Sequence, residues 1–383
     1  MILKKFSDNL NQLIVIILLF NIGNISAGEM NNVDTIIREA IQDSIFPGSV
    51  LMIGNRSKIL YTKAYGKHDY SEKGYLTNVK DIFDLASLTK VIATTMAIMR
   101  LQEDGIISIH DRVINYIPKF AQNNKSKVKI INLLVHNSGL PPGKPFYKTC
   151  NNKEQVLDSL YAMPLEYPTG KKIVYSDLGF IVLGRIIEIC SGSSLDKYVK
   201  HNFYLPLKMN NTFYNPPDHL WKRIVPTEPE YNYRIYDPPI KPKNKITQTM
   251  DGVAGHAGLF SSAPDLSICA RMLLNNGYYG EKRYFKKSTI NLFTTTQLNE
   301  SSRGLGWDTG NGGNKYRIGN SFSEAAFGHT GFTGTSIWID TIKNIFIIFL
   351  SNRTYKMKNR EEIYNFRPIL HDAILEDYGN LIK

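Results

Sequence analysis

The sequence predicts an α+β fold: an antiparallel sheet built from both chain termini and flanked by helices, with an inserted all-helical lobe. Two strand-like apolar runs lie near the start, at 48–54 and 58–67, on either side of a tight polar turn. Two more lie near the end, at 334–340 and 344–352. The chain between them carries helical periodicity. Strands at both ends and helices in the middle predict a sheet with a helical insertion.

The helices are predicted from apolar residues that recur every three or four positions. A first helix at 33–43 and another near the C terminus are expected to cover the sheet. A long helix starts at Ser87 and ends at Gly105, a favoured stop. Further helices are predicted within 127–143, 175–192 and 261–277, the last with Ser262 and Asp265 as a capping box.

Composition indicates one large domain. The chain has 383 residues, of which 43% are hydrophobic. We expect a single domain at 31–383, with an α/β lobe at about 31–86 and 303–383 and a mainly helical lobe at about 87–302. Between Tyr214 and Asp251 the chain is rich in Pro, Tyr and Lys, which predicts a long extended excursion.

The net charge of +12 comes from basic residues that are scattered along the chain. No nucleic-acid-binding module is visible, so a biased composition explains the charge better than a nucleic-acid partner does. A general affinity for an anionic envelope stays open. The three cysteines form no C-x-x-C pair, which argues against a zinc or redox motif. Their disulfide pairing also stays open; they are Cys150, Cys190 and Cys269.

Residues 1–27 have the features of a secretory leader. Two lysines precede the apolar run Leu13–Ile22, which has the length of a signal-peptide core and is short for a spanning helix. Small residues follow, so cleavage after Ala27 is expected, with retention as a membrane anchor as the alternative. The sequence therefore predicts export, to the periplasm or the outer face of the cytoplasmic membrane.

The first candidate for chemistry is Ser87, with Lys90 one helical turn later. A serine in the first turn of a helix faces free backbone N–H groups and the positive end of the helix dipole, which favours an alkoxide. Lys90 projects along the same face, and its small or apolar neighbours fit a dry pocket that makes it a better base. The alternative is a helix-capping serine beside a solvated lysine. Two further Ser-x-x-Lys pairs occur, Ser126/Lys129 and Ser194/Lys197.

Two later stretches favour the chemical interpretation. YSDLGF starts at Tyr175, where a phenol at a helix start can lie near the serine. FGHTGFTG enters the last hairpin; there His329 and Thr330 are candidates to bind a substrate carboxylate. Gly331 leaves room for a substrate backbone beside the strand. The amide of Phe332 can then join that of Ser87 as two donors to an oxyanion.

Ser-x-x-Lys, then a tyrosine motif, then His-Thr-Gly, in this order and spacing, resembles the serine β-lactamase and penicillin-binding-protein superfamily. The chain is most similar to the class C-type branch, which includes D-Ala-D-Ala carboxypeptidases, class C β-lactamases and esterases. LLVHNSGLP, AGHAGLFSSAPDL and GLGWD also look like landmarks of this branch, and the resemblance covers about 33–378. It implies the β-lactamase/transpeptidase-like fold, with the site between the two lobes, and no metal or organic cofactor.

The resemblance also implies a role for each matching residue. Ser87 would be the acylated nucleophile. Lys90 and Tyr175 would share a proton as the general base of acylation and deacylation, with coupled titrations. Lys90 or His329 would supply the cation that a Tyr175 phenolate needs.

The amides of Ser87 and Phe332 would form the oxyanion hole of this family. His329 and Thr330 would bind or orient the substrate, beside the clearance that Gly331 provides. The expected partner is a small molecule or peptide, namely a peptidoglycan stem peptide, a β-lactam or an ester.

This chain departs from the family pattern at Asp177, where Asn is usual. An ionised Asp cannot donate a hydrogen bond to a substrate carbonyl, and it can instead hold Lys90 charged. Asp177 is therefore either a substrate-site residue or a helix-start carboxylate. His329 stands where many β-lactamases have Lys, and its charge is expected to vary around neutral pH. His136 is interpreted as structural, and the Arg353 region as a solvated face or, less well, a carboxylate receptor.

These observations favour an exported serine hydrolase that forms an acyl-enzyme at Ser87: a D-Ala-D-Ala carboxypeptidase, a penicillin-binding-type peptidase, or a related amidase or esterase. A class C-like β-lactamase is the alternative, and it differs in the rate of deacylation. A penicillin-binding sensor without turnover, or a scaffold, is the alternative of another class.

Overall fold

The computed structural model describes residues 30–229, 240–298, 301–311, 315–357, 359 and 361–381. The predicted leader, 1–27, lies outside the described residues. Among the described residues, no single helix is long and apolar enough to cross a membrane, and only one helix pair, bent by 71°, meets that test jointly.

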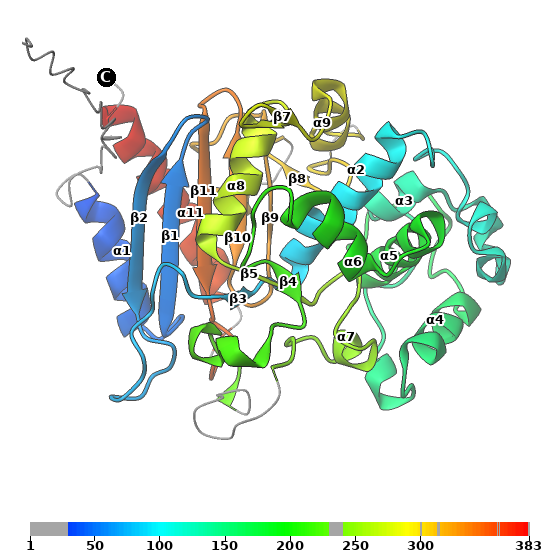
Figure 1. Ribbon diagram of the computed structural model, residues 1–383, viewed down its shortest axis with the longest axis horizontal. Coiled ribbons are helices and arrows are strands. Elements are labelled where there is room, and N and C mark those ends of the chain that lie inside the picture. The colour runs from blue at the N-terminus through cyan, green and yellow to red at the C-terminus, as the bar shows by residue number, and fades with distance from the viewer. Residues whose placement is uncertain are drawn as a thin grey trace, which may run out of the picture.

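A six-stranded antiparallel sheet forms one side of the molecule (Figure 1). Its strand order is β2-β1-β11-β10-β9-β8, so the first two strands of the chain pair with its last four. The predicted sheet from both termini is confirmed. The strands are β1 (Gly48–Gly54), β2 (Ile59–Gly66), β8 (Asp308–Thr309), β9 (Ala326–Thr330), β10 (Ser336–Asp340) and β11 (Ile345–Ser351).

Helices cover both faces of this sheet because its central strands are apolar on both sides. Every residue of β1 and β11 is buried. On one face, Leu51 and Phe349 lie opposite each other and pack with α1 (Asn31–Gln42) and α11 (Glu362–Leu381). On the other face lies α8 (Ala263–Leu274), as Figure 1 shows.

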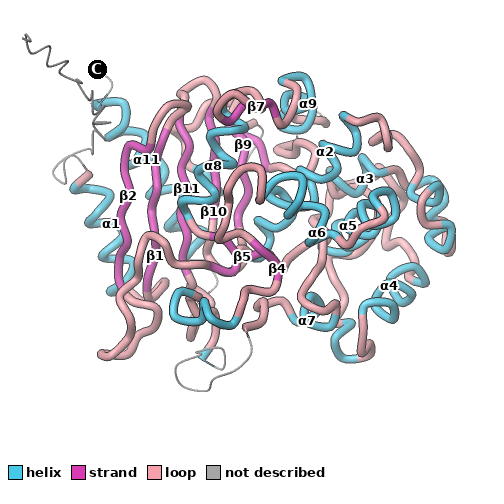
Figure 2. The backbone as a smooth tube through the Cα atoms, in the orientation of Figure 1, coloured by secondary structure: helices cyan, strands magenta, loops and turns pink. Residues whose placement is uncertain are grey.

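The helical lobe fills the chain between the strands (Figure 2). Its centre is the apolar α5 (Asp177–Ser191), which is buried along most of its length and ends at a left-handed Gly192, as the pattern predicts. Its other helices are α2 (Met96–Glu103), α3 (Ile130–Leu134), α4 (Lys153–Ala162), α6 (Leu195–Val199), α7 (Lys245–Thr249) and α9 (Lys287–Thr294). The short α10 (Lys315–Ile318) packs against α11.

Two local predictions are wrong. The excursion 214–251 is not simply extended: it contains a 3₁₀ turn at Asp218–Arg223 and helix α7, while 230–239 lies outside the described residues. Ser262 is the N-cap of α8, but its side chain makes no capping bond. Asp265 instead accepts from Asn211 and Thr212, because these groups of the preceding loop compete for its carboxylate.

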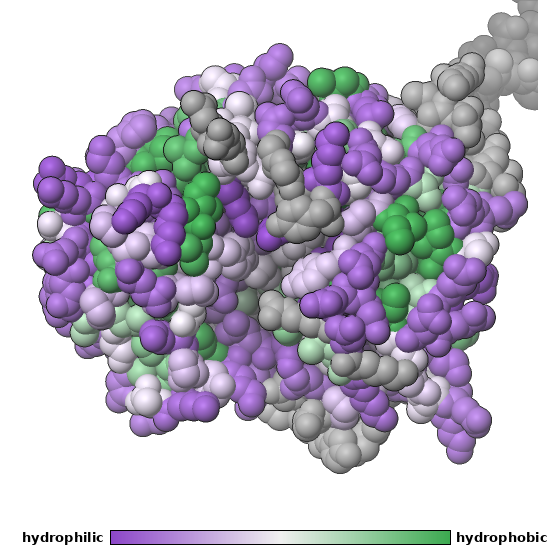
Figure 3. All heavy atoms as spheres, turned by 180° about the vertical axis from the view of Figure 1, so that it is seen from behind, coloured by the Kyte–Doolittle hydropathy of each residue, from purple (hydrophilic) through white to green (hydrophobic). Residues whose placement is uncertain are grey.

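Two minor sheets complete the fold. One has the strand order β3-β5-β4, formed by β3 (Phe83–Asp84), β5 (Leu259–Ser261) and β4 (Phe213–Tyr214). The other pairs β6 (Tyr278–Tyr279) with β7 (Lys282–Arg283). Strand β3 leads directly to Ser87, so the first of these sheets connects the excursion to the candidate nucleophile. Seen from behind, the surface is mainly hydrophilic, with apolar residues in limited areas (Figure 3).

Candidate active site

Ser87 lies in a 3₁₀ turn, Ala86–Leu88, that opens a continuous helical segment. A π-helical stretch follows at Lys90–Thr95 before regular α2 begins, so the single regular helix that the pattern predicts is wrong in detail. π-helical turns are rare in proteins, and those that occur often lie at functional sites. Ala86 has φ +46°, a left-handed conformation that is uncommon for a residue with a side chain.

Lys90 is fully buried and its ammonium has three polar partners. Nζ donates to Ser87 Oγ at 3.1 Å, to Asp177 Oδ1 at 2.7 Å and to the carbonyl oxygen of His256 at 3.0 Å. The solvated-lysine alternative is therefore wrong for this pair. The lysines of the other two Ser-x-x-Lys pairs, Lys129 and Lys197, are exposed.

Tyr175 is held at the start of α5 by His136. The carbonyl of His136 accepts from Val174 N at 2.8 Å, and its ring Nδ1 accepts from Ser176 N at 3.1 Å. The two rings lie 4.6 Å apart. The phenol of Tyr175 interacts with both Lys90 and Ser87. His136 is thus structural, as predicted, and it fixes the backbone on both sides of Tyr175.

The protonation states follow from burial and from one ion pair. Burial is the largest single influence on the pKa of Lys90 and lowers it, but the charge of Asp177, the nearby Tyr175 and their hydrogen bonds together leave that pKa raised. Burial is likewise the largest single influence on the pKa of Asp177 and raises it, but the charge and hydrogen bond of Lys90, with smaller contributions from His256 and His329, together leave that pKa lowered. Burial raises the pKa of Tyr175 despite Lys90. The resting site therefore holds an ammonium, a carboxylate and a neutral phenol.

His329 is buried and neutral. Its Nδ1–H donates to the carbonyl of Thr330 at 2.8 Å, which leaves Nε2 as an acceptor, with no partner among the described residues. Burial lowers the pKa of His329 to about 4. The expectation that its charge varies around neutral pH is wrong, because desolvation outweighs the nearby carboxylate of Asp308. The second cation beside Tyr175 is instead Arg303, 5.4 Å from the ring centre.

Close packing requires glycine at position 331, and the sequence alone did not reveal this. A Cβ at this position would lie 2.1 Å from Thr335 Oγ1 and 2.5 Å from the carbonyl oxygen of Leu85. Glycine therefore lets the end of β9 approach the backbone just before the serine. This close approach brings Phe332 and Ser87 to the same cavity.

A cavity of about 440 Å³ opens at this point. The sequence-predicted residues that line it are Ser87, Tyr175, His329, Thr330, Gly331 and Phe332. Four more lining residues were not predicted: Asp308, Arg317, Tyr364 and Arg367. Lys90 and Asp177 lie behind this wall, joined to it through Ser87 and Tyr175. The structure thus brings all the predicted side chains of the site together.

Arg317 and Arg367 line the cavity, and Arg353 borders it through its contact with Phe332. Arg367 is buried, its Nη2 donates to the carbonyls of Gly331 and Thr335, and its Nε has no partner among the described residues. Arg353 is only 2% exposed and lies over the Phe332 ring at 4.7 Å, so the solvated-face interpretation is wrong for this residue. It holds for the exposed Lys356, while Lys358 and Arg360 lie outside the described residues. Isolated arginines in a C-terminal segment carry no local pattern that would have identified them.

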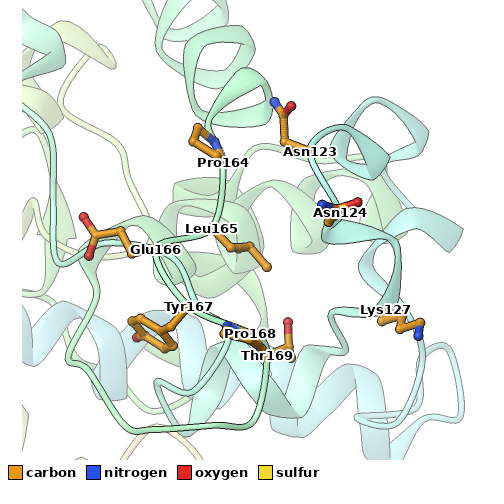
Figure 4. A pocket seen from close by; sticks show the side chains of 9 residues that line it. All are labelled: Asn123, Asn124, Lys127, Pro164, Leu165, Glu166, Tyr167, Pro168 and Thr169. Atoms are coloured by element: carbon orange, nitrogen blue, oxygen red, sulfur yellow. The ribbon is translucent and has the colours of Figure 1, made fainter.

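A larger pocket of about 680 Å³ lies in the helical lobe, between 123–127 and 164–169 (Figure 4). It contains none of the sequence-predicted site residues. The chemistry described above therefore belongs to the smaller cavity.

A family model described as Beta-lactamase matches residues 33–367. The chain belongs to the beta-lactamase family. It is 34% identical to "N-acetylmuramyl-L-alanine amidase" of Bacillus subtilis (strain 168), over 86% of this chain and 82% of that protein. It is also 34% identical to "Putative D-alanyl-D-alanine carboxypeptidase" of Escherichia coli (strain K12), over 85% of this chain and 82% of the other.

A solved penicillin-binding protein homologue from Caulobacter crescentus has the same fold, with a TM-score of 0.71 at 18% identity over 91% of this chain and 97% of the other. The predicted fold class and family resemblance are both confirmed. Beta-lactamase family membership, with relatives named as an amidase and a carboxypeptidase, identifies the chain as a serine hydrolase.

Proposed function

We propose that this beta-lactamase family member is an exported hydrolase of peptidoglycan-type amides that acts through an acyl-enzyme at Ser87. A D-Ala-D-Ala carboxypeptidase or a related amidase fits best. The observation that carries the proposal is the buried Lys90 ammonium at 3.1 Å from Ser87 Oγ, where Ser87 lines a cavity together with Arg317 and Arg367. The names of the two relatives support the substrate class. The apolar run near the N terminus supports export.

Acylation requires that Ser87 lose a proton as its oxygen attacks the substrate carbonyl. In the resting site Lys90 is already protonated, so it must first give up a proton. Asp177, 2.7 Å away, stabilises that proton on Lys90, so the neutral amine forms when the proton is lost to solvent at higher pH, and the amine can then take the proton on Ser87. Tyr175 contacts both groups and can pass a proton to the leaving amine. Water then hydrolyses the ester with the same groups acting in reverse.

The negative charge that develops on the substrate oxygen needs two donors. The amides of Ser87 and Phe332 are the candidates, since both residues line the cavity. Oxyanion-hole donors typically contribute about 10²- to 10³-fold to the rate.

The arginines favour a substrate that carries a carboxylate. Burial lowers the pKa of Arg367 to about 9, with a further contribution from Arg353, so this guanidinium stays charged at neutral pH. Asp308, the one acid among the lining residues, is already paired with Arg303 and lies 3.9 Å from Arg317. An anionic substrate group bound by these arginines would lie in the same cavity as Ser87, which fits a stem peptide that ends in a free carboxylate.

The β-lactamase alternative is less favoured because of Asp177. Its carboxylate accepts from Lys90 and cannot donate to the side-chain amide carbonyl of a penicillin or cephalosporin. Acylation by such compounds is therefore expected to be inefficient, although the machinery at Ser87 remains suitable for it.

The variant Asp177→Asn tests the ionisation of the site. Because Asp177 raises the pKa of Lys90, the neutral amine forms only at alkaline pH, and kcat/KM of the wild type should rise with pH. Removing the carboxylate leaves burial to lower that pKa. The rising limb should then move to lower pH by about one unit or more. An unmoved limb would contradict this assignment. Asp196→Asn, in the first turn of α6, is the matched control.

The function is tested with four substrates: a peptide ending in D-Ala-D-Ala, the same peptide with an amidated C terminus, a muramyl-L-alanine peptide, and a chromogenic cephalosporin. We expect hydrolysis of the first or third with a kcat/KM at least about tenfold above that for the cephalosporin. Amidation should weaken the peptide substrate. Efficient turnover of the cephalosporin with no peptide cleavage would overturn the proposal in favour of a β-lactamase.

A further inference from the structure

We propose that Asp84 is a positioning residue for the two oxyanion donors of the Ser87 site. It would act by fixing three segments to one another: the serine turn, the loop after β9 and the end of the excursion. The inference rests on the proposed function, since it concerns the geometry of the same acylation step.

The side chain of Asp84 fixes the serine turn. The residue is 2% exposed, and its Oδ1 accepts from the amide of Ala86 at 2.8 Å. Ala86 has φ +46°, a conformation that is unfavourable for a residue with a side chain and persists only where the surroundings impose it. The next amide is that of Ser87, one of the two proposed oxyanion donors. The bond from Asp84 thus sets the direction of that amide.

The backbone of Asp84 fixes the second donor. Its carbonyl accepts from Thr333 Oγ1 at 2.7 Å, and the next carbonyl, that of Leu85, accepts from Thr335 Oγ1 at 3.2 Å. Thr333 directly follows Phe332, whose amide is the other proposed donor. The distance between the two donors is therefore set by hydroxyl groups that hold the β9 loop against 84–85.

The second carboxylate oxygen reaches the excursion. Asp84 Oδ2 accepts from the amide of Lys243 at 2.6 Å. The following residue, Asn244, places its Oδ1 3.2 Å from the ring Nε2 of His256, and the carbonyl of His256 accepts from Lys90. The same short segment is thus tied to the serine turn through Asp84 and to the lysine through His256. Movement of this segment would disturb both groups together.

Asp84 also gives the site a group that titrates near physiological pH. Burial raises its pKa to about 6, opposed by its backbone hydrogen bonds and by the charge of Lys243, which itself pairs with Glu228. The neighbours from β5 and from the β9 loop, Phe260 and Thr333, carry no charge. The ionised carboxylate accepts both N–H bonds, whereas protonation turns one oxygen into a donor.

Activity is therefore expected to fall more steeply below about pH 6, where Asp84 becomes protonated, than the protonation of Lys90 alone would cause. The histidines of the site do not account for such a limb. Burial lowers the pKa of His256 and of His329 to about 4, and that of His136 well below its usual value.

The test compares Asp84→Asn with Asp81→Asn, a buried control whose carboxylate bonds to His68 at 2.5 Å and to the amide of Asn78 at 2.6 Å, away from the site. Both enzymes and the wild type are followed from pH 5 to 8 with a nitrophenyl ester, and thermal unfolding is measured beside kcat and KM. Asp84→Asn should lower kcat about 10- to 100-fold, change KM much less and lose the acid limb near pH 6. Asp81→Asn should keep kcat and the limb even where it unfolds earlier.

If Asp84→Asn does not fold, Thr333→Val gives a milder version, since it removes only the bond to the carbonyl of Asp84. A several-fold loss in kcat is expected there. The inference is overturned if both variants keep the wild-type kcat, or if the control loses kcat to the same extent. Failure of the wild type to form any acyl-enzyme would overturn the proposed function, and this inference with it. Wild-type acylation with unaffected variants overturns this inference alone.

Discussion

Replacing Ser87 by alanine is expected to lower hydrolysis of the preferred peptide by about 10⁴-fold or more. The hydroxyl is the group that becomes acylated, and it accepts a hydrogen bond from the buried Lys90 ammonium. The substitution leaves only a small change of volume in a 3₁₀ turn, so folding should be preserved. Steady-state rates and thermal unfolding measured on the same preparations check both points.

Ser194→Ala is the matched control for this change, because Ser194 also precedes a lysine by three residues and stands at a helix start. Its Lys197 is exposed, so we expect wild-type rates. If Ser194→Ala lost as much hydrolytic activity as Ser87→Ala, the result would contradict a special role for Ser87. Wild-type hydrolysis by Ser87→Ala would assign the nucleophile elsewhere.

Replacing Lys90 by methionine is expected to lower kcat by about 10²- to 10⁴-fold, the usual contribution of a general base. It should also destabilise the protein. Asp177 would lose the partner that keeps its pKa low, and burial, the largest influence on that carboxyl, would then raise its pKa. Single-turnover acylation and urea unfolding separate these two effects.

The double variant Lys90→Met/Asp177→Asn removes both members of the ion pair, so it should recover stability without recovering acylation. Lys125→Met provides the control for burying methionine in place of lysine. Lys125 is equally buried, but its ammonium donates to the carbonyls of Gln122 and Met163 and not to Ser87. It should lose stability and keep acylation. Acylation by Lys90→Met within tenfold of the wild type would rule out the base assignment.

Much of the fold follows from local pattern. The apolar alternation at 48–54 and 344–352 predicts β1 and β11, and the periodic run from Asp177 to a glycine stop predicts α5, because burial and capping depend on near neighbours in sequence. The short strands β3, β4 and β8 could not be predicted, since two-residue strands owe their existence to distant partners.

The candidate site also has features that local sequence predicts and features that depend on the fold. Ser87, Lys90, Tyr175 and His329 stand in short motifs with recognisable spacing. Their protonation states could not be predicted from these motifs. The neutral His329 and the charged Lys90 result from burial and from contacts between segments distant in the chain. Asp84 is three residues from the serine, yet its role depends on Thr333 and Lys243, which only the fold brings to it.

The central claim is that Ser87 carries the acyl group. Its most direct test is time-resolved intact-protein mass spectrometry of the wild type and Ser87→Ala, treated with penicillin and with a nitrophenyl ester, followed by peptide mapping. We expect one adduct per wild-type chain, mapped to Ser87 and absent from the variant. Loss of the adduct over time would report deacylation. An adduct on Ser87→Ala, or no adduct on the wild type with either reagent, would contradict this claim.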